Sequence, residues 1–286
     1  MSTPDRPVAI VTGASSGIGR ATALLFASSG YRVFATVRTL EAEESLRAAA
    51  SGHHIEVVRL DMADEAAVAR VAREILARAG RVDVLVNNAG FAQIGSAEDL
   101  SPDEIRRQFQ VNLFGPIQLA REVLPAMRAR GHGRIVNVSS LAGLTSVPLM
   151  GAYCASKSAL EAFSDAMRVE AKPFGVRVIV VEPGPVRTEF QRAALANGRR
   201  VLESPSPYAA VYRSYVDGGF ETDGGATPEQ VARTILRAVR ARRPRARYRP
   251  RLVDGLMALF ASITPRIAID WVLVRWMGVE GVTAKR

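Results

Sequence analysis

Residues 8–19 read VAIVTGASSGIG, and this stretch decides which fold we expect. The apolar, β-branched run at 8–12 is typical of a strand buried on both faces of a sheet. A glycine-rich turn follows it, and a helical pattern covers residues 17–29. Glycines allow a tight turn, and the start of a helix offers free N–H groups and a positive dipole end to an anion. The stretch therefore predicts a phosphate-binding turn, although its spacing is not G-x-G-x-x-G and a purely structural turn is the alternative.

Strand and helix patterns alternate along the rest of the chain. Further strands are expected at 31–37, 54–60, 82–88, 134–140, 176–184 and 246–250. Further helices are expected at 41–50, 64–79, 101–130 with an interruption near Pro116, 151–172 and 228–242. This alternation predicts an α/β fold of the Rossmann type, with a doubly wound, mostly parallel seven-stranded sheet and helices on both faces. We expect one domain over residues 1–286, with a substrate lid at 185–226 and a basic, amphipathic extension at 240–286.

The composition narrows the class of protein. Of the 286 residues, 48% are hydrophobic, which is enough to bury a large core. Cys154 is the only cysteine, so no disulfide can form within the chain, as is usual in a reducing compartment. The first residues show no signal-sequence pattern, and no apolar run reaches about 18 residues, so we expect a cytoplasmic protein.

The net charge of +10 is concentrated in one segment. Residues 240–251 (RARRPRARYRPR) hold seven arginines and no acidic residue, and the rest of the chain carries only +3. Such local basicity does not indicate a nucleic-acid-binding protein. In the apolar stretch that follows we expect two short amphipathic helices, which would cover the substrate cleft or contact another subunit. The arginines also permit peripheral docking of 240–286 on an anionic membrane.

The residue after the second strand bears on the choice of cofactor. A carboxylate at that position would bind a ribose 2′-hydroxyl and favour NAD. This chain has Arg38 there, and a guanidinium can pair with a 2′-phosphate. The sequence therefore favours NADP(H), with NAD less favoured, unless Arg38 is only a solvated loop residue.

Several motifs that follow one another in a fixed order resemble those of the short-chain dehydrogenase/reductase family. They are TGASSGIG (12–19), Asp61, NNAG (87–90), Asn112, Ser140, YCASK (153–157) and PGPVRT (183–188). Their order, with Ser140 thirteen residues before Tyr153, makes the resemblance specific. The extended C-terminus and GYRVFATVR (30–38) are similar to the hydroxysteroid and retinol dehydrogenase branch.

The resemblance implies a role for each matching residue. It implies that Asp61 holds the adenine amino group, that 88–90 line the adenosine side and that 183–188 close over the nicotinamide. The implied cofactor-binding residues are Gly13, Ser15, Ser16, Gly17, Ile18, Gly19, Arg38, Asp61, Met62, Asn88, Ala89, Gly90, Tyr153, Lys157, Pro183, Gly184, Val186 and Thr188. The implied catalytic residues are Asn112, Ser140, Tyr153 and Lys157, with Asn112 distorting its helix and holding a water.

The spacing of Tyr153 and Lys157 suggests how such chemistry would work. The two residues are four apart in a predicted helix, so both side chains leave the same face. Reduction of a carbonyl leaves an alkoxide that needs a proton, and an ordinary tyrosine has a pKa of about 10. We expect the Lys157 ammonium, at about 4 Å, to lower the pKa of Tyr153 by roughly 3 units, and oxidised nicotinamide would add to the effect. Ser140 would donate a hydrogen bond to the substrate oxygen.

The substrate is expected to be a small hydrophobic carbonyl or alcohol. An apolar lid would carry Phe190, Leu195, Tyr208, Tyr212, Tyr215 and Phe220, and residues 141–150 would form the opposite wall. Packing of these aromatic residues on the core alone is the alternative. Cys154 is expected to be a packing residue, and His53, His54 and His132 fall in loops, so no metal site is expected.

Two other functions and an assembly remain open at this stage. A reductase of 3-oxoacyl thioesters would use the arginines to receive an acidic carrier. A cofactor-sensing binding protein would keep the fold without catalysis. We also expect a homodimer or homotetramer that pairs through the helices at 101–130 and 151–172.

Overall fold

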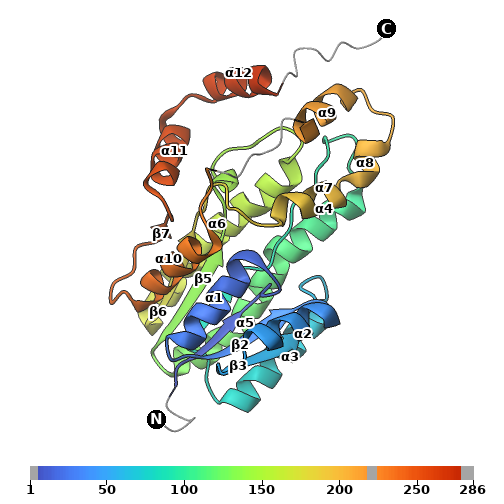
Figure 1. The fold of residues 1–286 in the computed structure, drawn as a ribbon. Coiled ribbons are helices and arrows are strands. Elements are labelled where there is room, and N and C mark those ends of the chain that lie inside the picture. The colour runs from blue at the N-terminus through green and yellow to red at the C-terminus, as the bar shows by residue number, and fades with distance from the viewer. Residues whose placement is uncertain (1–5, 218–223, 278–286) are drawn as a thin grey trace.

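Seven parallel strands form one sheet in the order β3-β2-β1-β4-β5-β6-β7 (Figure 1). The computed structural model describes residues 6–217 and 224–277. The strands are β1 Val8–Val11, β2 Arg32–Val37, β3 Ile55–Arg59, β4 Val84–Asn87, β5 Gly133–Val138, β6 Val176–Val181 and β7 Arg247–Tyr248. The strand order reverses between β1 and β4, and ligands of such sheets bind outside the carboxyl ends of the strands at that point. The predicted doubly wound parallel sheet is confirmed.

Helices cover both faces of the sheet. One face carries α1 Gly17–Ser28, α2 Leu40–Ala49 and α10 Pro228–Arg240. The other carries α3 Glu65–Ala79, α5 Gly115–Ala129 and α6 Gly151–Ala171. Alternate residues of β1 serve the two faces, because Ala9 and Val11 belong to the first cluster while Val8 and Ile10 belong to the second. This double burial is why VAIV contains no polar residue.

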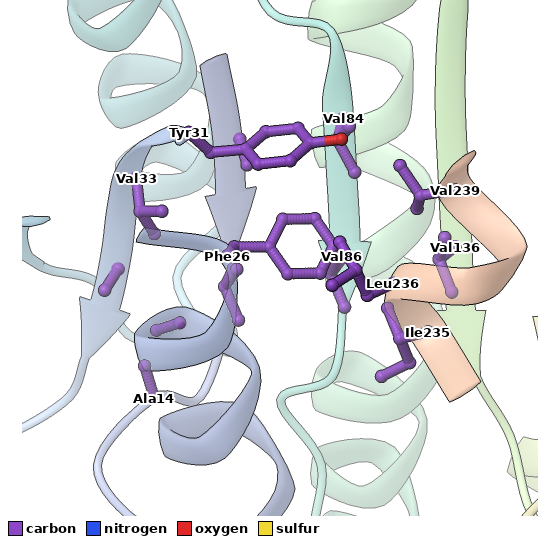
Figure 2. Close-up of a cluster of buried hydrophobic side chains, with 14 of the residues drawn as sticks. Ala14, Phe26, Tyr31, Val33, Val84, Val86, Val136, Ile235, Leu236 and Val239 are labelled. Atoms are coloured by element: carbon purple, nitrogen blue, oxygen red, sulfur yellow. The ribbon is translucent and has the colours of Figure 1, made fainter. Parts of the chain in front are cut away.

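The core on the α1 side is built around Phe26. Its side chain is fully buried, and its ring centroid lies 4.8 Å from that of Tyr31. Figure 2 shows Phe26 reaching from α1 toward Val86 of the sheet and Leu236 of α10. Because Leu236 lies 210 residues after Phe26 in the sequence, this contact packs the C-terminal part of the fold against its N-terminal part.

The long helix expected at 101–130 is interrupted near Pro116, as predicted. It consists of α4 Pro102–Phe109, a π-helical turn at Gln110–Phe114 and α5. Pro116 follows this π-turn by two residues, and because it has no N–H it cannot donate to a carbonyl oxygen one turn earlier in the continuous helix. The interruption is therefore the π-turn, which contains Asn112, and such turns are frequent at functional sites.

Residues after β6 show no clear periodicity, yet they form three short helices. These are α7 Phe190–Asn197, α8 Arg199–Glu203 and α9 Ala209–Asp217. The tail forms the two expected short helices, α11 Leu252–Ile263 and α12 Arg266–Trp276. Phe220 of the expected lid and the last nine residues of the extension lie outside the described residues.

No single helix in the described ranges is long and apolar enough to cross a membrane. Only α11 and α12 taken together, through Arg275, reach the required length and hydropathy, and the chain bends by 119° between them.

Candidate active site

The turn between β1 and α1 is closed by glycines that no larger residue could replace. Gly13 has φ +66°, and a Cβ atom there would lie 2.7 Å from Ala89 Cα. A Cβ atom on Gly19 would lie 2.1 Å from the Gly13 carbonyl oxygen. Nonbonded carbon atoms pack at about 3.5–4.0 Å, so both positions exclude a side chain. The turn is thus a backbone surface, on which Ser15 and Ser16 are exposed.

Hydrogen bonds tie this turn to the loop after β4. Thr12 Oγ1 accepts from the backbone N–H groups of Asn88 and Ala89, each at 3.0 Å. Asn88 Nδ2 donates to the carbonyl oxygens of Thr12 (2.9 Å) and Gly13 (3.2 Å). The two predicted cofactor loops are therefore fixed to each other by groups of the chain itself.

The start of α1 is suited to an anion. Ser16 at the N-cap makes no side-chain hydrogen bond to the helix, and the first turn contains no acidic residue. By contrast, α3 is capped by Asp64, which accepts from the Ala67 N–H, and Glu65 follows. The backbone N–H groups in the first turn of α1 are thus available to a ligand. They lie beside the backbone of Gly13 and Gly19, where a Cβ atom would fill the space. Gly17 also lies close to Thr188, since a Cβ atom on it would be 3.0 Å from Thr188 Cγ2. These features fit the pyrophosphate of a dinucleotide.

Arg38, Asp61 and Met62 follow the ends of β2 and β3 on the same side of the sheet. Val37 pairs with Arg59, and the Leu60 N–H donates to the Val37 carbonyl oxygen at 2.8 Å. The Arg38 and Asp61 side chains are exposed, and Asp61 Oδ1 accepts from the Ala63 N–H at 2.9 Å. Met62 is buried instead. The exposed Arg38 guanidinium and Asp61 carboxylate therefore lie at the edge of the sheet where the adenosine end of the cofactor was expected.

The four predicted catalytic residues come from three elements and meet at one place. Tyr153 and Lys157 lie on α6, Ser140 follows β5, and Asn112 lies in the π-turn. The Lys157 ammonium lies 5.9 Å from the Tyr153 ring centroid and donates to the Val138 carbonyl oxygen at 2.8 Å. A Cβ atom on Gly90 would lie 3.2 Å from Asn112 Oδ1 and 3.6 Å from Lys157 Nζ. The loop after β4 therefore reaches both the predicted cofactor turn and this cluster.

Asn112 holds the chain at Phe91. Its Oδ1 accepts from the Phe91 N–H at 3.1 Å, and its Nδ2 donates to the Phe91 carbonyl oxygen at 3.0 Å. The same Nδ2 lies 3.1 Å from Ser156 Oγ on α6. The side chain is buried and links the π-turn, the β4 loop and α6. The expected helix distortion is present, and it allows one side chain to serve all three.

The pKa of Tyr153 differs from our expectation. Burial raises it to about 12, and a hydrogen bond with the Ser140 hydroxyl opposes this only in part. Burial also lowers the pKa of Lys157 to about 8, against the attraction of Glu161. The expected lowering of the Tyr153 pKa by Lys157, to which oxidised nicotinamide would add, does not appear in the protein alone, because burial removes water from both groups. The phenol remains a protonated donor at neutral pH.

Sequence reasoning missed a pair of buried carboxylates behind Lys157. Glu161 lies four residues after Lys157 on α6, and its Oε1 accepts from Ser139 Oγ at 2.7 Å. Glu182 is fully buried at the end of β6, where Arg247 Nε lies 2.8 Å and an Arg249 terminal nitrogen 2.6 Å from its oxygens. The four-residue spacing was the only signal for Glu161, and nothing local marked Glu182.

An apolar cluster extends from Tyr153 toward the lid. Its members include Ala92, Ile94, Leu149, Tyr153, Cys154, Ala194, Val201, Val211, Tyr212 and Met277. Phe190, Leu195, Tyr208 and Tyr215 of the lid and Ala142, Val147 and Met150 of the expected wall pack against it. The Phe190 ring centroid lies 5.7 Å from that of Tyr153. The lid aromatics thus pack around the candidate catalytic tyrosine, and Cys154 is a fully buried free thiol within the cluster.

Within the described ranges, no group of three or more His, Cys, Asp and Glu side chains is placed to hold a metal ion.

Comparison with known proteins gives consistent matches. The family model described as short chain dehydrogenase matches residues 7–198. "Uncharacterized oxidoreductase YusZ" of Bacillus subtilis (strain 168) is 38% identical over 277 residues, which cover 94% of this chain and 98% of that protein. "17-beta-hydroxysteroid dehydrogenase type 1" of Homo sapiens is 36% identical over 255 residues, covering 85% of this chain and 77% of that protein. A solved short-chain dehydrogenase from Streptomyces avermitilis has a TM-score of 0.77 and 34% identity, and the match covers 96% of this chain and 98% of that one.

Two further solved structures contain different nicotinamide cofactors. A metagenomic short-chain oxidoreductase in complex with NADP has 32% identity and a TM-score of 0.68, with 86% of this chain and 97% of that chain covered. A short chain dehydrogenase/reductase from Burkholderia phymatum in complex with NAD has 28% identity and a TM-score of 0.75, with 91% of this chain and 94% of that chain covered.

Proposed function

This chain belongs to the short-chain dehydrogenase/reductase family, on its hydroxysteroid and retinol dehydrogenase-like branch, and from that premise we propose that it moves a hydride between NADP(H) and a hydrophobic ketone or aldehyde and the corresponding alcohol. The family membership makes it an oxidoreductase with a nucleotide-binding Rossmann fold. The cofactor preference, the substrate class and the roles of individual residues are our proposal.

One observation carries the proposal. A buried tyrosine with a lysine one turn away on the same helix stands at the junction of an anion-binding turn and an apolar cluster. A non-catalytic sensor would need only the anion-binding turn. A charged carrier would need a polar entrance, whereas the groups around Tyr153 are mainly apolar.

The free N–H groups of α1 and the Gly13 backbone would bind the pyrophosphate, and Thr188 lies beside them. Arg38 supports NADP(H) over NAD because its exposed guanidinium can pair with a 2′-phosphate. Asp61 remains the proposed partner of the adenine. Residues 183–186 would cover the nicotinamide end.

When bound, the nicotinamide supplies or accepts the hydride. Tyr153 gives its phenolic proton to the oxygen of the carbonyl as negative charge develops there, or takes it back in alcohol oxidation. Ser140, hydrogen-bonded to that phenol, orients the same oxygen and donates to it. Lys157 keeps a positive charge near the phenol, which stabilises the phenolate left after transfer. Asn112 holds Phe91 and α6 in place, and the apolar cluster excludes water.

A series of carbonyl compounds of increasing size tests the proposal. We expect consumption of NADPH, more slowly of NADH, with lipophilic ketones or aldehydes, and we expect Tyr153→Phe to abolish it. Turnover only of acyl thioesters attached to an acidic carrier would replace the proposed substrate. Binding of NADPH without turnover of any carbonyl would indicate a sensor instead.

Association of copies through α5 and α6 stays a prediction. Exposed apolar side chains on α6 include Phe163 (41% exposed) and Val169 (62%). Phe114, which directly precedes α5, is also 49% exposed. Sedimentation velocity of the full chain would give a dimer or tetramer, and Phe163→Glu would shift it toward the monomer.

A further inference from the structure

The two C-terminal helices expose an unusual amount of apolar surface. On α11, Leu252 is 90% exposed, Leu256 66%, Phe260 60% and Ile263 70%. Their spacing along the chain places them on one side of the helix. Val253, Met257 and Leu259 widen that side, and α12 adds Ile267, Trp271 and Val272, all exposed. In Figure 1 both helices lie apart from the helices that cover the sheet.

The orientation of α11 is the reverse of that of an ordinary surface helix. Its buried residues are Asp254 and Ala258, whereas its large apolar side chains face outward. Asp254 is held by Arg251, which donates from its terminal nitrogen at 2.7 Å and from its backbone N–H at 3.1 Å. A Cβ atom on Gly184 would lie 2.5 Å from Asp254 Oδ1, so this ion pair docks α11 on the loop after β6. Polar contacts therefore fix the helix and leave its apolar side for something else.

A basic hollow borders this apolar side. It measures about 470 Å³ and is lined by Arg237, Ala241, Arg245, Arg247, Tyr248, Arg249, Arg251, Leu252 and Gly255. Arg247, Arg249 and Arg251 are already paired with buried carboxylates. Arg237, Arg243 and Arg245 are exposed, and no acidic side chain of the described ranges forms an ion pair with them. Leu252 belongs both to the hollow and to the apolar side, so the two surfaces are continuous.

We propose that α11, α12 and the arginines of 237–245 form one docking surface for an anionic phospholipid membrane, with lipid phosphates at the arginines and the apolar side chains among the acyl chains. Helices with an apolar side, flanking arginines and exposed Trp, Phe and Leu bind in the plane of a membrane interface. Arginines near an anionic leaflet add an electrostatic attraction of about 1 kcal/mol each. The 119° bend between the helices gives no straight span across the bilayer.

Charge favours a membrane over a second copy of the chain as the occupant. A two-fold contact through this surface would bring the same patch of each copy together. The unpaired arginines would then face their own counterparts and repel. A nucleic acid would satisfy the arginines, but it would leave Leu256, Phe260 and Ile263 in water.

The test is co-sedimentation of the full-length chain with vesicles of phosphatidylcholine alone or mixed with phosphatidylglycerol. We expect binding to the mixed vesicles in about 0.15 M salt and much weaker binding in about 1 M salt, where the Debye length falls from about 8 to about 3 Å. Little binding to phosphatidylcholine alone is expected. Equal binding to both kinds of vesicle, or binding to neither, would overturn the proposal.

Matched variants separate the two parts of the surface. Arg243→Ala with Arg245→Ala should lower the partition coefficient on mixed vesicles about 30-fold, whereas Arg73→Ala with Arg121→Ala removes the same charge elsewhere and should have little effect. All four side chains are exposed, so neither pair should disturb folding. Equal losses from both pairs would mean that only the net charge matters, against a localised docking surface.

The apolar half has its own control. Leu256→Glu with Phe260→Glu should abolish binding, whereas Leu40→Glu with Phe174→Glu, at 53% and 48% exposure, should not. Thermal unfolding would verify that each variant is folded. If the chain instead sediments as an oligomer that Phe260→Glu dissociates, and vesicles do not bind, the surface joins copies of the chain and the proposal fails.

Discussion

Replacing Glu161 by Gln is predicted to stabilise the protein in mildly alkaline solution. Burial raises the pKa of Glu161 from 4.5 to about 7, although Ser139 donates a hydrogen bond to it. Folding therefore costs free energy whenever this group must be ionised in the interior. Gln is close to the protonated carboxyl in shape, can still accept from Ser139 Oγ, and carries no charge.

The pKa values give the size and sign of the effect. A shift of about 2.5 units at about 1.4 kcal/mol per unit corresponds to about 3 kcal/mol. Because the pKa is higher in the folded chain, the folded state binds more protons. The contribution of Glu161 to stability is thus fully present below about pH 4.5 and is lost as the pH rises through about 7. The advantage of Gln should be near zero at about pH 4.5 and approach 3 kcal/mol at about pH 8.

Several charged groups face Glu161 and must keep their own states for this difference to hold. They are Lys157 on α6, Glu182 just after β6, and Arg247, which lies 3.5 Å from Glu161 Oε2 and also pairs with Asp165. Arg247 attracts the ionised form and opposes the effect of burial and of Glu182. The change in the stability advantage of the Gln variant between about pH 4.5 and about pH 8 is therefore a better test than its stability at a single pH.

Urea unfolding followed by far-ultraviolet circular dichroism measures the free energy of unfolding at each pH. At about pH 8 this free energy should be about 3 kcal/mol higher for the Gln variant than for the parent chain. Glu170→Gln, at an exposed position of the same helix, is the control and should change little at either pH. A Gln variant that is less stable at pH 8, or equally stabilised at both pH values, would refute the claim that an ionised Glu161 is costly.

Three further predictions concern catalysis, cofactor choice and packing. Tyr153→Phe should lower the rate of carbonyl reduction about 10²–10⁴-fold with little change in stability. Because burial raises the pKa of Tyr153 to about 12, the parent enzyme should keep its proton donor from about pH 6 to 9. A rate that falls with a midpoint near pH 7 would contradict this. Arg38→Glu should lower the ratio of kcat/KM for NADPH over NADH about 30-fold, as expected for loss of a charged hydrogen bond of about 2 kcal/mol; an unchanged ratio would show that Arg38 is only a solvated residue. Phe26→Ala should destabilise the fold by about 3–5 kcal/mol in urea unfolding, since the ring is fully buried between α1 and the sheet, and a loss below about 1 kcal/mol would contradict that packing.

The sequence by itself determined the sheet and predicted the residues that form the candidate site. β-Branched runs, glycines at the first turn and the Tyr153–Lys157 spacing are local patterns, and local geometry is enough to interpret them. The family motifs then identified Asn112, Ser140 and the cofactor loops, and the structure brings these segments together. Even the interruption of the long helix near Pro116 was expected, and it takes the form of a π-turn at 110–114.

Only the tertiary structure decided the properties that depend on what surrounds a residue. Whether Lys157 lowers the pKa of Tyr153 depends on how much water both lose, and the packing of the lid and β5 around α6 determines that. Glu161 and Glu182 face each other because β6 ends beside α6, a proximity that no spacing along the chain encodes. The outward apolar side of α11 follows from the burial of Asp254, whereas the sequence pattern alone would have turned that side inward. Periodicity shows which residues share a face, but desolvation and charge come from neighbours that are distant in the sequence.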